Sequence, residues 1–225
     1  MCCLRRSIAA SSSKDPIEHG KVQTIMASQL AAEKVLVLLG SPRKNGSTAT
    51  LAQQLIKGAE DAGAQVESIY LNAQKVSPCQ GCYVCQKPES KGCAVDDDMQ
   101  TIYPKLIEAD AWVFATPVYF FSFSAQTKLL LDRCFALNAY GVKPWRDKRI
   151  AVAMTYGGKD PFSSGCINAL RTFHDIANYV HAQIVGMVYD RGPNPEDVSS
   201  NANLLARAEE LGKKLVVGSR RPATV

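Results

Sequence analysis

Several features are scarce or missing in this sequence, and each absence excludes a class of protein. No apolar run approaches the roughly 18 residues that a membrane-spanning helix needs, so we expect no membrane partner. Only three of the 225 residues are histidine, and no Ser-His-Asp or Cys-His arrangement for nucleophilic catalysis is evident. Lysine and arginine are scattered and the formal net charge is only +5, so a nucleic-acid partner is not indicated.

Two common nucleotide-binding motifs are also missing. A P-loop has four residues between its glycines and then a lysine, whereas five residues separate Gly40 from Gly46 here and no lysine follows. The dinucleotide fingerprint G-x-G-x-x-G is absent. The composition, with 46% hydrophobic and 21% charged residues, is that of a globular protein, and the length suits one α/β domain.

The two ends of the chain differ from its middle. Residues 1–33 lack the apolar core of a secretory signal, and we expect a disordered leader with Met26 near the functional start. Residues 34–218 are predicted to form one domain, and residues 219–225 a C-terminal tail.

Short apolar runs alternate with segments of helical periodicity along the predicted domain. The predicted strands are Val35–Leu39, Gln65–Leu71, Ala111–Ala115, Ile150–Met154 and Ile184–Tyr189. Helical patterns begin at Ser47, after Asp98, before Leu129, near Ile167 and before Leu204. Repeated βα units of this kind predict the α/β class, with a parallel sheet and helices on both faces.

Three of these strands lead into unusual loops, which parallel pairing would bring to one edge of the sheet. Residues 40–48 join a buried strand to a helix N-terminus and carry hydroxyls, an amide and Arg43, which suits a phosphate. Residues 116–121 are apolar and aromatic, which suits a flat ring, although core packing is the more frequent fate of phenylalanine. Residues 155–160 contain two glycines, which allow close backbone approach.

The motifs in these loops resemble those of the flavodoxin-like NAD(P)H-dependent FMN reductases. They read GSPRxNGST at 40–48, TPVYF at 116–120 and YGG at 156–158, and the resemblance covers about residues 34–218. It implies a three-layer sandwich with a five-stranded parallel sheet in the order 2-1-3-4-5. It also implies FMN as cofactor, NAD(P)H as co-substrate, a cytoplasmic location, and a homodimer or homotetramer with the flavin near a subunit interface.

The resemblance assigns site residues as well. The FMN phosphate would be held by Ser41, Arg43, Asn45, Ser47 and Thr48. The isoalloxazine ring would lie between Pro117, Val118, Tyr119 and Phe120 on one side and Thr155, Tyr156, Gly157 and Gly158 on the other. No side chain is expected to be catalytic, because FMN would be the reactive group and hydride transfer requires mainly ring orientation. His174 and His181 are interpreted as packing residues.

Four of the eight cysteines fall in the long connection 72–97, as Cys79, Cys82, Cys85 and Cys93. Their spacing, C-x2-C-x2-C-x7-C, overlaps iron–sulfur patterns and is unusual for structural zinc, although zinc and free thiols stay open. The motif also resembles that of archaeal-type iron–sulfur flavoproteins, where the cysteines hold a [4Fe–4S] cluster. Cys134 and Cys166 are expected to be buried structural thiols on helices.

Three functions follow from these observations. The first is an oxidoreductase that takes hydride from NAD(P)H and reduces a small acceptor such as a flavin or a quinone. The second is a one-electron carrier with a ferredoxin-like partner, which low-potential electron delivery with little NAD(P)H oxidation would favour. The third is a non-catalytic redox sensor that works through the cysteine loop, and it predicts protein without flavin.

Overall fold

The computed structural model describes residues 32–140, 144–146 and 148–217. The leader predicted for residues 1–33, with Met26, lies outside these residues except for its last two positions, and so does the tail predicted for 219–225. The described residues include no helix long and apolar enough to cross a membrane.

Five parallel strands form the sheet, in the order β2-β1-β3-β5-β6. They are β1 (Lys34–Leu39), β2 (Gln65–Tyr70), β3 (Ala111–Tyr119), β5 (Arg149–Tyr156) and β6 (Gln183–Arg191). Numbered among themselves, the parallel strands run 2-1-3-4-5, which confirms the predicted fold class and order. β3 and β5 are buried along most of their length because both faces of these central strands are covered by helices.

A sixth strand, β4 (Ser122–Phe123), was not predicted. It pairs antiparallel with the end of β3, with Val118 opposite Phe123 and Tyr119 opposite Ser122. The prediction of a loop at residues 116–121 is therefore wrong in part, since β3 continues through Tyr119. The turn consists of Phe120 and Phe121, whose φ angles of 45° and 69° are in the left-handed region.

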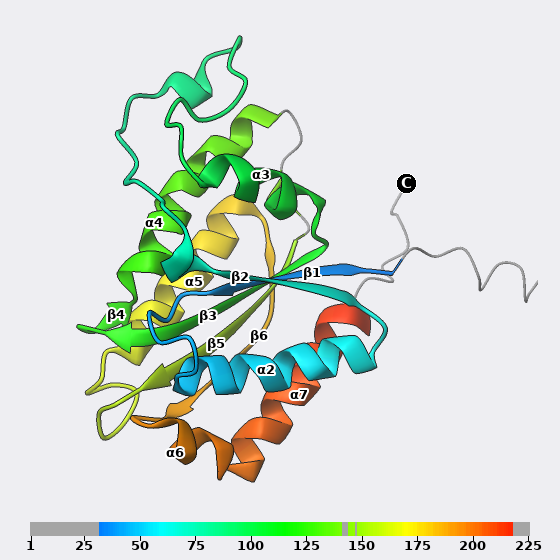
Figure 1. The fold of residues 1–225 in the computed structure, drawn as a ribbon, viewed down its shortest axis with the longest axis vertical. Helices are drawn as coiled ribbons and strands as arrows, with labels where there is room; N and C mark the ends of the chain where they lie inside the picture. Colours follow the sequence, from blue (N-terminus) through cyan, green and yellow to red (C-terminus); the bar gives the residue numbers. More distant parts are fainter. Residues whose placement is uncertain (1–31, 141–143, 147, 218–225) are drawn as a thin grey trace, which may run out of the picture. The chain divides into compact units, whose positions relative to one another are not determined.

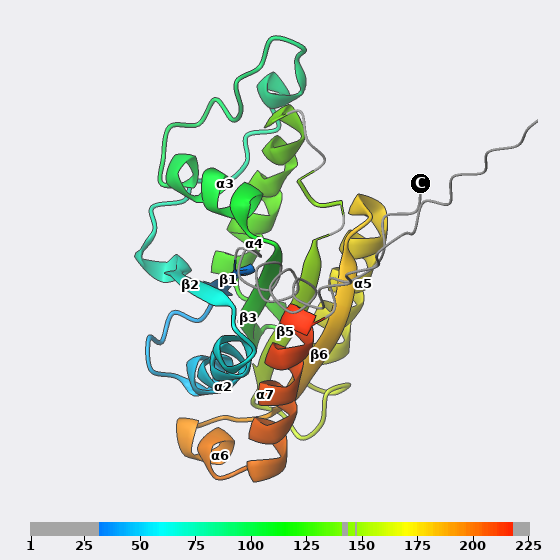
Figure 2. The same cartoon turned by 90° about the vertical axis from the view of Figure 1, so that its right-hand side faces the viewer.

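Helices cover both faces of the sheet, as Figures 1 and 2 show. α2 (Ser47–Asp61) and α7 (Ala202–Val217) lie on one face, and α3 (Met99–Glu108), α4 (Ala125–Arg133) and α5 (Cys166–Val180) lie on the other. Shorter helices are α6 (Pro195–Ser199) and the 3-10 turns η1 (Leu71–Ala73), η2 (Val84–Gln86) and η3 (Cys134–Tyr140). Each face of the sheet has its own hydrophobic cluster.

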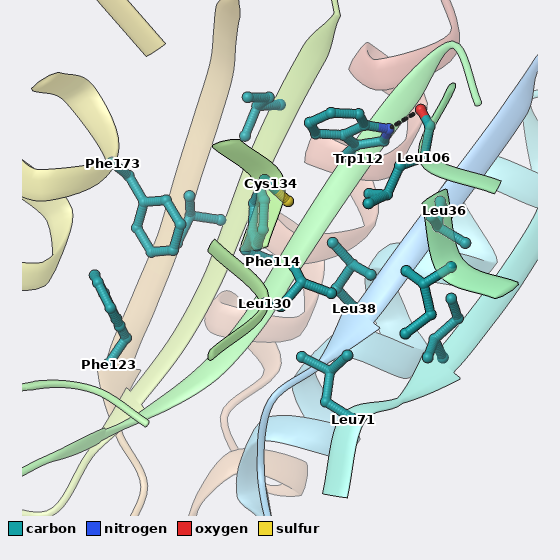
Figure 3. Packing of buried hydrophobic residues seen from close by; sticks show 14 of the residues in the cluster. Leu36, Leu38, Leu71, Leu106, Trp112, Phe114, Phe123, Leu130, Cys134 and Phe173 are labelled. Atoms are coloured by element: carbon teal, nitrogen blue, oxygen red, sulfur yellow. Dashed lines mark hydrogen bonds between the residues drawn. The ribbon is translucent and has the colours of Figure 1, made fainter. Parts of the chain in front are cut away.

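The cluster under α3, α4 and α5 contains the buried aromatic side chains of the described residues (Figure 3). The indole N–H of the buried Trp112 donates to the Leu106 carbonyl at 3.0 Å, which ties β3 to the end of α3. Cys134 and Cys166 are buried in the same cluster, as predicted. This packing fixes α4, whose C-terminal part lines the larger of the two cavities described below.

The buried Cys166 thiol should make the fold less stable at alkaline pH. Burial raises its pKa from 9.0 to about 12, so the folded state favours the neutral thiol and this contribution to stability is complete below pH 9. The contribution is lost as the pH rises from 9 toward 12. Between pH 8 and pH 11 we expect the free energy of unfolding, measured with urea, to decrease. The decrease should be roughly 2 kcal/mol smaller in Cys166→Ala than in the unmodified chain. Equal losses in both proteins would contradict this.

Candidate functional site

A cavity of about 230 Å³ lies where β1, β3 and β5 end, and it joins the three loops singled out in the sequence. Figure 1 shows these strand ends on the same side of the sheet. Ten of the thirteen predicted cofactor-binding residues line it: Ser41, Arg43, Ser47, Thr48, Pro117, Val118, Tyr119, Thr155, Tyr156 and Gly157. Their convergence follows from the parallel pairing of β1, β3 and β5.

Three predicted residues do not line this cavity. Asn45 is exposed on the first loop, and Phe120 is 96% exposed at the β3–β4 turn. Gly158 packs against Ser164 instead, because a Cβ at this glycine would lie 2.4 Å from the Ser164 hydroxyl. Its role in the structure is therefore to close the third loop.

The first loop is held from both sides by hydrogen bonds. The Gly40 N–H donates to the Ala115 carbonyl at 2.7 Å, and the Ser124 hydroxyl donates to the Gly40 carbonyl at 2.6 Å. On the other side, the Tyr70 hydroxyl donates to the Pro42 carbonyl at 2.7 Å. The loop is thus positioned by β2, β3 and the N-terminus of α4.

The N-terminus of α2 opens at this cavity. Gly46 is the N-cap, and no side chain caps the helix, so the amides of its first turn have no intrahelical acceptor. Arg43 also lines the cavity, whereas none of the lining residues is an acid. Uncapped amides, the helix dipole and one guanidinium without a nearby carboxylate fit a phosphate group.

The third loop closes the opposite wall of the cavity. The buried hydroxyls of Thr48 and Thr155 are 2.7 Å apart and share a hydrogen bond, which links the first loop to the third. Burial, followed by the charge of Asp190, raises the pKa of Tyr156 above its usual 10, so its phenol remains a hydrogen-bond donor at ordinary pH. Gly157 has no atom within 4 Å of where a Cβ would lie, which leaves its backbone open to the cavity.

The sequence interpretation missed three lining residues, Gly46, Gly192 and Pro193. Gly192 follows β6, and its N–H donates to the Tyr156 carbonyl at 2.9 Å. The available signal was positional, because the segment after the fourth apolar strand must reach the same edge of a parallel sheet as the other three.

A second cavity, of about 480 Å³, is lined by all four cysteines of the predicted motif. Cys79 and Cys82 are exposed, Cys93 is half-buried and Cys85 is buried. Left-handed φ angles at Gly81 (61°) and Tyr83 (57°) bend the backbone between them. Within the part of the chain that the structure describes, no three His, Cys, Asp or Glu side chains are grouped closely enough to hold a metal ion.

The donors on this wall are of the kind that holds an iron–sulfur cluster or a structural zinc ion. Among the described residues that line it there is no histidine and, besides the thiols, one carboxylate, that of Asp132. Iron–sulfur clusters are held by four cysteine thiolates, so a sulfur-only donor set suits one. Cys134 lines the same cavity, but burial raises its pKa well above the usual 9, which disfavours the thiolate that a metal needs.

The histidines do not contribute to either cavity. His174 and His181 are exposed, so their interpretation as packing residues is wrong. Neither lines the two cavities. His19 lies outside the described residues.

The chain matches known proteins over most of the described region. The family model of the NADPH-dependent FMN reductases matches residues 33–189. An iron-sulfur flavoprotein of Methanocaldococcus jannaschii is 32% identical over 197 residues, covering 81% of this chain and 95% of that protein. A putative NAD(P)H-dependent FMN-containing oxidoreductase of Bacillus subtilis is 26% identical over 188 residues, covering 80% and 97%.

Solved structures agree on the fold. An NAD(P)H:quinone oxidoreductase from Methanothermobacter marburgensis superposes with a TM-score of 0.64 at 19% identity, covering 82% of this chain and 100% of that one. An azoreductase from Bacillus anthracis superposes with a TM-score of 0.63 at 17% identity, covering 81% and 99%. With its sheet order, its loop motif at residues 40–48 and its cysteine motif, the chain belongs to the NADPH-dependent FMN reductase family, in the iron–sulfur flavoprotein subgroup, and is an FMN-dependent oxidoreductase with NAD(P)H as co-substrate.

Proposed function

We propose that this chain reduces a small planar acceptor, such as a quinone or a flavin, with electrons from NAD(P)H. The observation that supports this most directly is the single cavity in which the phosphate-fitting loop meets Tyr119 and Tyr156. Two proteins that share the fold are named a quinone oxidoreductase and an azoreductase. When bound, FMN supplies the hydride chemistry.

The residues of the chain would bind and orient the cofactor. The first-turn amides of α2, with Ser41, Arg43, Ser47 and Thr48, would hold the phosphate. Pro117, Val118 and Tyr119 on one wall and Thr155, Tyr156 and Gly157 on the other would orient the ring. The predicted contributions of Asn45, Phe120 and Gly158 have less support, because these residues lie outside the cavity lining.

A second function is favoured by the cysteine-lined cavity. We propose that Cys79, Cys82, Cys85 and Cys93 hold a [4Fe–4S] cluster. The Methanocaldococcus relative is named an iron-sulfur flavoprotein. Such a cluster would supply one-electron transfer to or from a ferredoxin-like partner. The two cavities share no lining residue, but Val118 of one and Phe123 of the other are partners across the β3–β4 hairpin.

An assembly of two or four copies would explain the exposed turn between β3 and β4. Phe120 and Phe121 are 96% and 56% exposed beside the proposed flavin site, and large exposed aromatic side chains commonly mark interfaces. A cytoplasmic location is proposed from the family resemblance alone.

Protein purified without oxygen would separate these functions. Flavin absorbance near ~450 nm with about four irons per chain supports a flavoprotein that holds a cluster. NADPH-dependent reduction of benzoquinone or riboflavin supports the reductase, and fast reduction by ferredoxin with slow NADPH oxidation supports the carrier. Colourless protein that cannot be reconstituted with FMN would contradict both the reductase and the electron carrier, and would favour the redox sensor.

Arg43→Ala tests the placement of the phosphate. Loss of a charge-assisted hydrogen bond costs about 1.5–3 kcal/mol, so the FMN dissociation constant should rise roughly 10- to 100-fold. Flavin fluorescence titration of the apoprotein measures it. Lys44→Ala is the matched control, because Lys44 is an exposed cation on the same loop that does not line the cavity. Equal affinities in the two variants would contradict the placement.

A further inference from the structure

The end of α4 carries a buried arginine that the proposed cofactor chemistry does not use. Arg133 is the last residue of the helix, and its side chain is fully buried. It forms a two-pronged ion pair with Asp97, with one terminal nitrogen 2.5 Å from Oδ2 and the other 3.0 Å from Oδ1. A buried ion pair of this geometry fixes both partners in position, because either charge alone would be costly in the interior.

The same guanidinium contacts both ends of the cysteine loop, which we define as residues 77–97. It donates to the Ser77 carbonyl at 2.8 Å, two residues before Cys79, and to the Val95 carbonyl at 3.4 Å, two residues after Cys93. The carboxylate of Asp97 also accepts from the Ser77 N–H at 2.8 Å. One side chain on a helix thus ties together two backbone segments that are 18 residues apart in the sequence.

Arg133 is also close to the fourth cysteine. The Tyr103 hydroxyl donates to the Arg133 carbonyl at 3.0 Å. Arg133 and Cys93 both line the cysteine cavity.

One donor of the guanidinium is left over. The Arg133 Nε is buried and has no hydrogen-bond partner among the described residues. Buried donors are paired in the great majority of cases, and an exception calls for an explanation such as a ligand that supplies the acceptor. A sulfur-rich anionic group held by the four cysteines would supply acceptors and negative charge beside this cation.

We propose that Arg133 is the positioning residue of the cysteine loop: it clamps Ser77 and Val95, keeps Cys93 on the cavity wall, and offers its positive charge to the anionic group that the cysteines bind. This inference rests on the proposed cluster only for its last part, because the clamp exists in the chain without metal. The two parts therefore need separate readouts.

The first readout uses metal-free protein. Alkylation of each cysteine by iodoacetamide, followed by mass spectrometry, should label Cys93 slowly relative to the exposed Cys79 in the unmodified chain. In Arg133→Met the ratio of the Cys93 rate to the Cys79 rate should rise about tenfold, because the loop opens locally. Lys128→Met is the matched control, since Lys128 lies on the same helix and lines the same cavity but, among the described residues, forms its ion pair with Asp132.

Arg133→Met leaves the Asp97 charge buried and could prevent folding, so a double variant is included. Arg133→Gln with Asp97→Asn removes both charges while keeping polar side chains, and because glutamine is shorter than arginine the variant should fold and show the same faster labelling of Cys93. An unchanged labelling ratio in this folded double variant would overturn the clamp, whatever the metal content of the protein.

The second readout uses protein reconstituted with iron and sulfide. Arg133→Met should bind less iron and shift the reduction potential of the bound cluster to more negative values, because a positive charge beside it is lost. Arg133→Lys should restore the potential in part. Iron bound normally at an unchanged potential in Arg133→Met would overturn the charge role. Absence of iron from the unmodified chain would refute the cluster, and with it the charge role, while the labelling result still decides the clamp.

Discussion

Replacing Gly40 by alanine is expected to lower the melting temperature by about 5–15 °C. A Cβ at this buried position would lie 2.0 Å from the Thr127 hydroxyl and 3.1 Å from the Ser124 hydroxyl. Overpacking costs typically 1–3 kcal/mol, and displacing Ser124 also breaks its bond to the Gly40 carbonyl. For a chain of this size each kcal/mol corresponds to roughly 2–4 °C. Calorimetry or circular dichroism would measure the shift.

Two controls make this result specific. Gly157→Ala should leave the melting temperature nearly unchanged, because open space surrounds the position of its Cβ. Adding Thr127→Ala to Gly40→Ala should recover part of the loss, because the hydroxyl that the new methyl group would strike is removed. If the Gly40→Ala protein had the same melting temperature as the unmodified chain, the first loop would not be anchored as described.

The edge of the sheet that carries the candidate flavin site was predictable because its signals are local. Three of the predicted strands are apolar at every position, namely Val35–Leu39, Ala111–Ala115 and Ile150–Met154. Such runs are typical of strands covered on both faces. Strand type then fixes geometry: parallel strands end at one edge, so the loops that follow must meet. For the same reason most of the residues that line the cavity could be predicted. The segment after β6 reaches the same edge and was overlooked.

The β3–β4 hairpin could not be predicted, because its turn contradicts local preference. Two-residue hairpin turns with positive φ favour Asn-Gly, whereas Phe120 and Phe121 stand here. Tertiary contacts compensate: Gly165 lies so close to Phe121 that a Cβ would be 2.4 Å from the Phe121 Cα. Asn168 also donates to the Phe121 carbonyl at 3.4 Å. No pattern within residues 116–123 indicates a glycine more than 40 positions away.

The clamp on the cysteine loop was hidden for a similar reason. Asp97 lies two residues before α3, and its Oδ1 accepts from the Met99 N–H at 3.1 Å, which is a local contact. Its stronger partner, Arg133, is 36 residues away at the end of another helix. Sequence spacing identified the four cysteines but could not show which side chains hold them on one wall.

Cys85→Ser is expected to abolish the binding of an intact cluster, with iron falling from about four per chain to a small remainder. Cys85 is the buried member of the motif, and its sulfur accepts from the Gln86 side chain at 3.2 Å. Gln86 also donates to the Phe135 carbonyl at 3.0 Å, so the thiol is oriented by the opposite side of the cavity. Serine keeps the size of the side chain but replaces the soft thiolate ligand by a hydroxyl.

Cys134→Ser is the matched control, because Cys134 lines the same cavity but lies outside the motif and is held neutral by burial. Its iron content and visible spectrum should equal those of the unmodified chain. Flavin binding should survive in both variants, since the two cavities share no lining residue. Loss of iron in Cys134→Ser but not in Cys85→Ser would replace Cys85 by Cys134 in the ligand set. Four irons retained in both would place the cluster elsewhere.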